Sequence, residues 1–208
     1  MRAVIIAALA CLMTSPAIGQ EVPLDLAPGS NIYWLNGYEG GYDQSREQLI
    51  ALGDDFAIYK TISEYLTGDV SDYFALFSGI DYRTCDGDMP TADERRALSD
   101  LWPLTEGGSA QISLPELATI EVGAATEFYL MDKRLPAHNV TIDYSDNENT
   151  QDEALIVLDQ IPVTVAIRWS ETEKDTATLI TGPKPEFTAD LSEETIGSCA
   201  GLLKETTN

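Results

Sequence analysis

Short apolar runs separated by turn residues constrain the fold of this chain more than any other sequence feature. In the run "PVTVAIRW" (162–169), the odd-numbered positions from 163 hold valine, valine, isoleucine and tryptophan, with threonine, alanine and arginine between them. This period of two indicates a β-strand with one buried face. Similar runs recur with turn signals roughly every 8–12 residues and no alternating helices, which favours a mainly β (α+β) fold, an antiparallel sandwich or barrel-like sheet.

Two segments predict particular parts of this sheet. The segment "EQLIALGDDFAIYKTIS" (47–63) holds two apolar runs around Gly53-Asp54-Asp55, which predicts a hairpin with a short turn. The segment "VSDYFALFSGIDYRTC" (70–85) is rich in aromatic and aliphatic residues, and it predicts one long strand that ends at Cys85.

Helical patterns occur in only two places. In "MPTADERRALSDLWPL" (89–104), Thr91 and Glu94 have the spacing of a capping box and Pro103 ends the run, which predicts one short helix at about 92–101. In "DLSEETIGSCAGLLKE" (190–205), Asp190 is a candidate N-cap for a C-terminal helical tail, which its glycines weaken.

The first residues predict a secretory signal peptide that spans 1–19. Arg2 supplies one positive charge, Val4–Met13 form an apolar run, and small residues lead to a cleavage site after Gly19. The run is shorter than the roughly 20 residues of a membrane span, so we expect no transmembrane segment and a periplasmic or secreted location. A lipid anchor at Cys11 is the alternative, although apolar residues continue beyond this cysteine.

The remaining chain predicts an extended N-terminal segment at 20–30 and a single β-rich domain at 31–208. The formal net charge is −23 at pH 7. Such an acidic protein repels phosphate backbones and anionic lipid surfaces. We therefore expect no nucleic-acid partner.

Two cysteines follow the predicted signal peptide, and outside the cytoplasm such thiols tend to pair. A disulfide between Cys85 and Cys199 would tie the C-terminal tail to the middle of the domain. The alternative is a nucleophilic Cys199, because "GSCAG" fits the pattern of a nucleophile elbow. An elbow needs a preceding strand, whereas the residues before Cys199 are acidic and helix-like.

Catalytic and metal-binding patterns are sparse. His138 is the only histidine, and no serine lies in a G-x-S-x-G motif that could use it as a base. The acidic segments with Asp86 and Asp88, and at 143–154, lack the spacing of an EF-hand and favour solvated turns, with calcium as the minor alternative. We expect no catalytic residue, no resident metal and no cofactor.

An aromatic, glycine-rich segment is the best candidate for ligand binding. It contributes the four candidate residues Tyr33, Trp34, Tyr38 and Tyr42. Aromatic side chains separated by glycines can form a stacking surface for a small molecule. The alternative is a strand end and a loop whose rings cover the core.

One stretch resembles uncharacterised exported bacterial β-rich proteins. It runs from "SGIDYRTCDGDMP" (78–90) through "ALSDLWPL" (97–104) to Gly107-Gly108. The resemblance implies an origin in the bacterial envelope and implies no activity.

Three functions remain open at this point. The leading hypothesis is a non-catalytic module that binds a small ligand or an envelope partner. The first alternative is an exported hydrolase with a carboxylate pair that only the fold assembles. The second is a lipocalin-like carrier of an apolar ligand, which requires a closed barrel with an apolar interior.

Overall fold

The predicted strands form one antiparallel sheet with the order β5-β4-β3-β2-β1-β11-β10-β9-β8-β7-β6, which confirms the mainly β fold. The computed structural model describes residues 26–63, 72–114, 116–131, 133–144, 153–183 and 185–205. The predicted signal peptide, Cys11 and residues 20–25 lie outside them. The strands are β1 (Asn31–Tyr38), β2 (Gly41–Leu52), β3 (Phe56–Ser63), β4 (Tyr73–Phe77), β5 (Asp81–Thr84), β6 (Ser109–Leu114), β7 (Glu116–Leu130), β8 (Lys133–Tyr144), β9 (Glu153–Leu158), β10 (Thr164–Arg168) and β11 (Lys174–Thr181).

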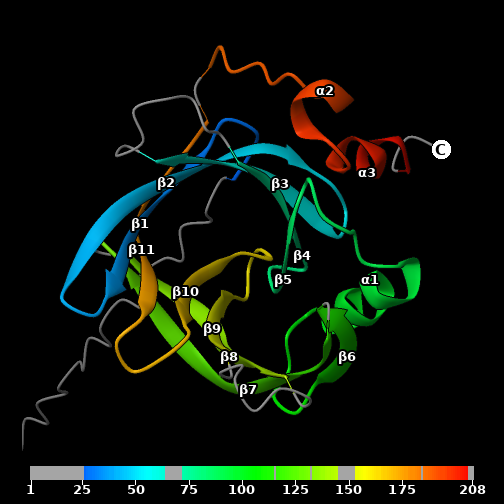
Figure 1. Ribbon diagram of the computed structural model, residues 1–208. Helices are drawn as coiled ribbons and strands as arrows, with labels where there is room; N and C mark the ends of the chain where they lie inside the picture. Colours follow the sequence, from blue (N-terminus) through cyan, green and yellow to red (C-terminus); the bar gives the residue numbers. More distant parts are fainter. Residues whose placement is uncertain are drawn as a thin grey trace, which may run out of the picture.

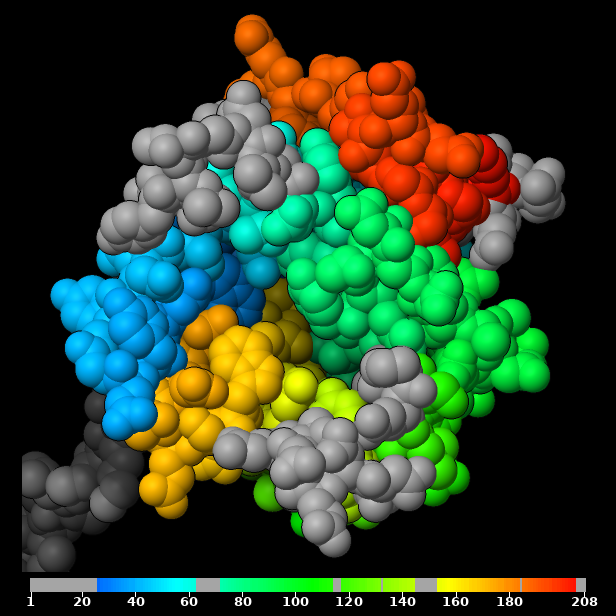
Figure 2. All heavy atoms as spheres, in the orientation of Figure 1, coloured from blue at the N-terminus to red at the C-terminus, as the bar shows by residue number. Residues whose placement is uncertain are grey.

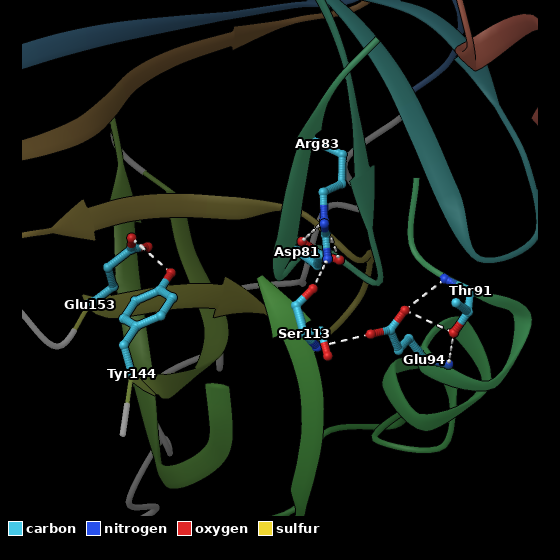
Figure 3. Close-up of polar contacts among 7 residues, drawn as sticks. All are labelled: Asp81, Arg83, Thr91, Glu94, Ser113, Tyr144 and Glu153. Carbon is cyan, nitrogen blue, oxygen red and sulfur yellow. Dashed lines mark hydrogen bonds and ion pairs between the residues drawn. The ribbon is translucent and has the colours of Figure 1, made fainter. Parts of the chain in front are cut away.

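The sheet curls strongly but does not close into a barrel (Figure 1). Its edge strands β5 and β6 approach each other, yet no backbone ladder joins them within the described residues. Side chains occupy the gap instead. Arg83 donates from Nη2 to the carbonyl oxygen of Ser113 (2.6 Å), and Glu94 Oε1 accepts the Ser113 N–H (2.9 Å; Figure 3). Because these groups satisfy the edge of β6, a further strand cannot pair at Ser113.

Apolar side chains pack into two clusters because the sheet buries parts of both faces. The first cluster combines strands with the helices, including Leu98, Ile196 and Leu202. The second contains only strand and loop residues, among them Trp34 and Tyr59. The three helices in the described chain, α1 (Ala92–Ser99), α2 (Glu193–Ile196) and α3 (Cys199–Glu205), therefore cover only one part of the sheet.

The single long strand predicted for residues 70–85 is wrong, because this segment forms a hairpin of β4 and β5. Ser78 and Gly79 turn the chain with positive φ angles of 50° and 71°. A Cβ atom on Gly79 would lie 2.5 Å from the carbonyl carbon of Pro162. Glycine is therefore required by both the backbone angle and the close approach of a second loop.

The helix predictions are confirmed in outline and corrected at the C-terminus. Thr91 and Glu94 form the predicted capping box at α1, which ends at Ser99. The tail forms two helices, since Gly197 breaks it with a φ of 52° and lies against the carbonyl oxygen of Cys85. The α2 N-cap is Ser192, and Asp190 accepts hydrogen bonds from Ser192 N–H and the Thr195 hydroxyl.

The predicted cysteine pair is confirmed. The two Cα atoms of Cys85 and Cys199 lie 5.2 Å apart with the sulfur atoms bonded, and both residues are buried. The bonded sulfur of Cys199 is not free to act as a nucleophile, and a helix rather than a strand precedes it. No helix within the described residues has the length and apolar character that a membrane crossing requires.

Candidate functional site

The four aromatic candidates do not share one surface. Tyr38 and Tyr42 are 50% and 68% exposed at the end of the β1–β2 hairpin, where the strand register places them on opposite faces. Tyr33 lies 6.0 Å from the Arg46 guanidinium. Trp34 is only 6% exposed and belongs to the second core cluster. Tyr33 and Trp34 together line a pocket of about 160 Å³, and of the four candidates only Trp34 also lines an interior cavity.

This interior cavity of about 60 Å³ lies on the inner face of the curled sheet. Figure 2 shows a hollow near the centre of the molecular face, between segments with the colours of β1–β2, β4–β5 and β9–β10, the elements that line the cavity. Its volume is equivalent to about two water molecules. The lining residues are Ile32, Trp34, Glu47, Tyr59, Phe74, Leu76, Ile80, Tyr82, Glu153, Leu155, Val163, Thr164 and Ile167.

Strand register explains why these residues meet. Glu47 lies opposite Ile32, Tyr59 lies opposite Phe74, and Tyr82 lies opposite Leu76. Directly paired residues share one face of an antiparallel sheet. The period of two then places all of them on the inner face of β1–β5.

Three aromatic rings form one wall of the cavity. The ring centroids of Tyr59 and Phe74 are 5.3 Å apart with nearly parallel planes, and those of Phe74 and Tyr82 are 4.4 Å apart. Trp34 adds a fourth aromatic side chain from β1. Such contacts fix the rings and give the cavity a rigid apolar surface.

Glu47 is the polar centre of the cavity. Burial raises the pKa of Glu47 to about 7, and the nearby charge of Asp175 acts in the same direction, whereas Trp34 acts to lower it. Glu47 as a whole residue nevertheless keeps part of its surface accessible. This combination is expected for a carboxylate that faces an interior cavity rather than bulk solvent.

Two buried polar groups beside Glu47 lack hydrogen-bond partners among the described residues, the Nε1–H of Trp34 and the hydroxyl of Tyr59. Trp34 is near enough to Glu47 to act as a weak hydrogen-bond donor that lowers its pKa, but its Nε1–H does not reach the geometry of a full hydrogen bond. Burial, and then the charge of Glu47, raises the pKa of Tyr59. Unsatisfied buried polar groups are rare because each costs about 1–3 kcal/mol. Both groups are therefore candidates for hydrogen bonds to a molecule bound in the cavity.

A second carboxylate, Glu153, lines the opposite side of the cavity. Tyr144 donates its hydroxyl to Glu153 Oε1 (3.1 Å; Figure 3), and burial raises the pKa of Glu153. Arg83 is already committed to the buried Asp81, with 2.9 Å between Nε and Oδ1. No lysine, arginine or histidine belongs to the cavity lining in the part of the chain that the structure describes.

A further carboxylate pair lies on the same inner face, closer to the β1–β2 turn. Asp43 and Asp175 flank Asn36 from the two neighbouring strands. Burial, and then the charge of Asp43, raises the pKa of Asp175 to about 6. The Oδ1 atom of Asp43 is buried and has no hydrogen-bond partner among the described residues.

The other candidate groups do not form a reactive site. His138 pairs with Asp159, with 2.7 Å between Nδ1 and Oδ1, but the thiols of Cys85 and Cys199 are bonded to each other. Within the described residues no group of three or more His, Cys, Asp or Glu side chains is arranged to hold a metal ion. The centre of the acidic segment, residues 145–152, lies outside the described chain.

A wider cleft of about 460 Å³ lies next to the disulfide and includes Asp72, Tyr73, Tyr82, Asp86 and Thr195 in its lining. None of its lining side chains is among the buried polar groups without a partner in the described chain. It therefore lacks the unsatisfied groups that distinguish the interior cavity.

Sequence reasoning missed Glu47, the most informative residue of the site. It is one of 35 acidic residues and stands at the start of a predicted hairpin. The available signal was its spacing of two from the apolar Leu49, which predicts the same inward orientation. Its pairing with β1 across the sheet was not visible in the sequence.

Comparison with family models, with curated proteins and with solved structures found no significant match to this chain.

Proposed function

We propose that this protein is an exported, periplasmic, non-catalytic module that binds a small ligand in the interior cavity around Glu47. One observation carries the proposal: the buried Nε1–H of Trp34 and hydroxyl of Tyr59 line the same cavity as the desolvated Glu47, and within the described residues neither forms a full hydrogen bond. Binding sites are typically concave and apolar, with a few convergent polar groups whose pKa values are perturbed.

Binding can be tested by NMR through the indole N–H signal of Trp34, which lines the cavity. A set of small neutral, cationic and anionic fragments is added to the purified protein. The proposal expects at least one fragment to shift the Trp34 signal. The indole of Trp102 donates to the carbonyl oxygen of Ser78 (2.9 Å) and serves as the internal control. If no fragment shifts the Trp34 signal selectively, the proposal fails.

The hydrolase alternative gains from one observation, since Glu47 and Glu153 line the same cavity and both have raised pKa values. A pair of carboxylates could act as acid and base on a glycosidic bond. The volume of about 60 Å³ holds only a few heavy atoms. It therefore leaves no room for a glycosidic linkage between Glu47 and Glu153. Turnover of a glycoside by the wild type that is lost in both Glu47→Gln and Glu153→Gln would favour this alternative.

The lipocalin-like carrier receives less support from the fold. Its closed barrel is not formed, because β5 and β6 are the two edges of the sheet and do not pair with each other within the described residues. The interior cavity is also far smaller than the ligand pockets of about 300–1,000 Å³ that hold drug-sized molecules.

A further inference from the structure

We infer that the ligand of the interior cavity is an organic cation, a primary ammonium group at the end of an aliphatic chain. This inference rests on the proposed binding function and adds the chemical class of the ligand. Three features argue for it: the charge of the cavity, its hydrogen-bonding groups and its size.

The charge of the inner face is one-sided. Glu47 and Glu153 line the cavity, and Asp43 and Asp175 lie farther along the same face. The basic residues of the same strands alternate onto the other face, because each pairs with a residue of that face: Arg46 with Tyr33, Lys60 with Tyr73, Lys174 with Gly37 and Arg83 with Ala75. A bound cation would neutralise the negative charge of these carboxylates, whereas an anion would be repelled by it.

The hydrogen-bonding groups fit an ammonium head. An ammonium group has three donors and no acceptor. Glu47 and Glu153 offer carboxylate oxygens, and the unpartnered Tyr59 hydroxyl offers lone pairs. With its second oxygen, Glu47 can accept the Nε1–H of Trp34. An ammonium group that stabilises the deprotonated form of Glu47 would therefore leave both the Trp34 Nε1–H and the Tyr59 hydroxyl with a hydrogen-bond partner.

The size and walls of the cavity restrict the cation further. Aromatic faces attract cations, and Trp34, Tyr59, Phe74 and Tyr82 surround this volume. A volume equivalent to about two water molecules admits a primary ammonium and its first carbon atoms but no trimethylammonium head. The rest of an aliphatic chain would extend through the hollow visible in Figure 2.

The second carboxylate pair gives the site a preferred ligand length. Asp43 precedes Glu47 by four positions on β2, which corresponds to about 13 Å along the strand. Asp175 is near Asp43, because both residues pair with Asn36 of β1, one from each side. A linear diamine can place one ammonium at Glu47 and the other near Asp43. Diamines should therefore bind more tightly than monoamines of the same length.

Calorimetry at pH 8 tests the ligand class with n-butylamine, its neutral isostere n-butanol, the anion butyrate and tetramethylammonium. It tests the ligand length with 1,8-diaminooctane against n-octylamine. We expect the three amines to bind, 1,8-diaminooctane at least about tenfold more tightly than n-octylamine. The other three compounds should bind at least about tenfold more weakly than n-butylamine. Glu47→Gln should weaken amine binding at least tenfold, and Glu121→Gln on an exposed part of β7 should not change it.

The outcomes separate this inference from the proposed function. If n-butanol or butyrate binds as tightly as n-butylamine, the cation assignment is overturned while ligand binding in the cavity stands. Equal binding of tetramethylammonium overturns the primary ammonium. If none of these compounds binds and no other fragment shifts the Trp34 signal, both proposals fail.

A pH series on the wild type keeps the test decisive should Glu47→Gln not fold. The titratable groups that act on Glu47 or share its cavity are Asp175, Tyr59, Tyr82 and Glu153. Protonation of Glu47 removes the charge that the ammonium needs, so amine affinity should fall toward about tenfold per pH unit below neutrality. Affinity that stays constant from pH 8 to pH 5.5 would contradict the inference.

Discussion

Two tyrosines on the inner face of the sheet differ in the hydrogen bonding of their hydroxyl groups. Tyr59 is 1% exposed and its hydroxyl has no partner among the described residues, whereas the hydroxyl of Tyr144 donates to Glu153 at 3.1 Å. A buried hydroxyl without a partner costs desolvation energy and returns none of it to the folded state. The proposed ligand site accounts for the Tyr59 hydroxyl, because departures from full hydrogen bonding are expected at functional sites.

Removal of the Tyr59 hydroxyl should therefore not harm the fold. We expect Tyr59→Phe to leave the free energy of unfolding unchanged or to raise it by up to about 1 kcal/mol, because the lost hydroxyl is unpaired. Tyr144→Phe is the matched control and should lower it by about 1 kcal/mol. Urea denaturation of both variants without ligand measures the difference. A loss in Tyr59→Phe as large as that in Tyr144→Phe would show that Tyr59 has a structural partner.

At the scale of elements, a side-chain bridge takes the place of a closing strand pair. Arg83 on β5 contacts Asp81 and the Ser113 carbonyl of β6, and Glu94 of α1 holds the Ser113 N–H (Figure 3). Hydrogen bonds from Thr91 and Ser113 lower the pKa of Glu94, although its partial burial acts in the opposite direction. The helix and both sheet edges are thus connected through the backbone N–H and C=O of one residue, Ser113.

The bridge predicts a large effect for Arg83→Met. Asp81 is fully buried, and burial raises its pKa to about 6 even with Arg83 present. Without Arg83 its charge would be uncompensated, so we expect a loss of about 3 kcal/mol or more at pH 7.5 and a smaller loss at pH 5. Arg96→Met removes an exposed ion pair with Asp93 and should change stability by less than about 1 kcal/mol. Equal effects of the two variants in urea denaturation would contradict the bridge.

The elements also show how far the sequence can predict this fold. The capping box at Thr91 and Glu94 and the β2–β3 hairpin were predictable because their signals lie within a few residues. The β4–β5 turn was missed because Ser78 and Gly79 sit inside an apolar run, and the reason for the glycine is the distant Pro162. The pairing of β1 with β11, and with it the inward orientation of Glu47 beside Asp175, depends on contacts between the two ends of the chain.

At the scale of the whole molecule, one covalent bond connects the C-terminal helices to the sheet. Cys85 and Cys199 close a loop with a sequence separation of 114 residues. In the chain-entropy description, a loop of this length stabilises the folded state by about 4–5 kcal/mol. The hydrogen bond from Ser198 N–H to the Cys85 carbonyl (2.9 Å) supports the same junction.

Reduction of the disulfide should therefore lower the free energy of unfolding by about 4–5 kcal/mol. Urea denaturation with and without a reducing phosphine measures the change, and the Cys85→Ser/Cys199→Ser variant should match the reduced wild type. A change below about 1 kcal/mol would show that the tail is held by its apolar contacts alone.

The pH dependence of stability follows from the buried acids taken together. Burial is the main cause that raises the pKa of Glu47 to about 7, those of Asp81 and Asp175 to about 6, and that of Glu153. Groups whose pKa is higher in the folded state bind protons more tightly there, so their stabilising effect is complete below their unfolded pKa values of about 4 and is lost as pH rises through about 6–7. The lowered pKa values of Glu94 and Asp190 act in the opposite direction only at more acidic pH.

We therefore expect the temperature of the thermal unfolding midpoint to decrease as the pH rises from 5 to 8. The self-repulsion of a chain with a net charge of −23 adds to this decrease. Glu47→Gln replaces the carboxylic acid that has the highest of these pKa values by a neutral amide. It should be more stable than the wild type at pH 8, by a few kcal/mol at most, and equal to it at pH 5. Calorimetric scans of both proteins across this range provide the measurement. A midpoint temperature that rises from pH 5 to pH 8 in the wild type would mean that basic groups of the protein already pair with the carboxylates of the inner face. The cavity would then offer no unpaired carboxylate for a cationic ligand.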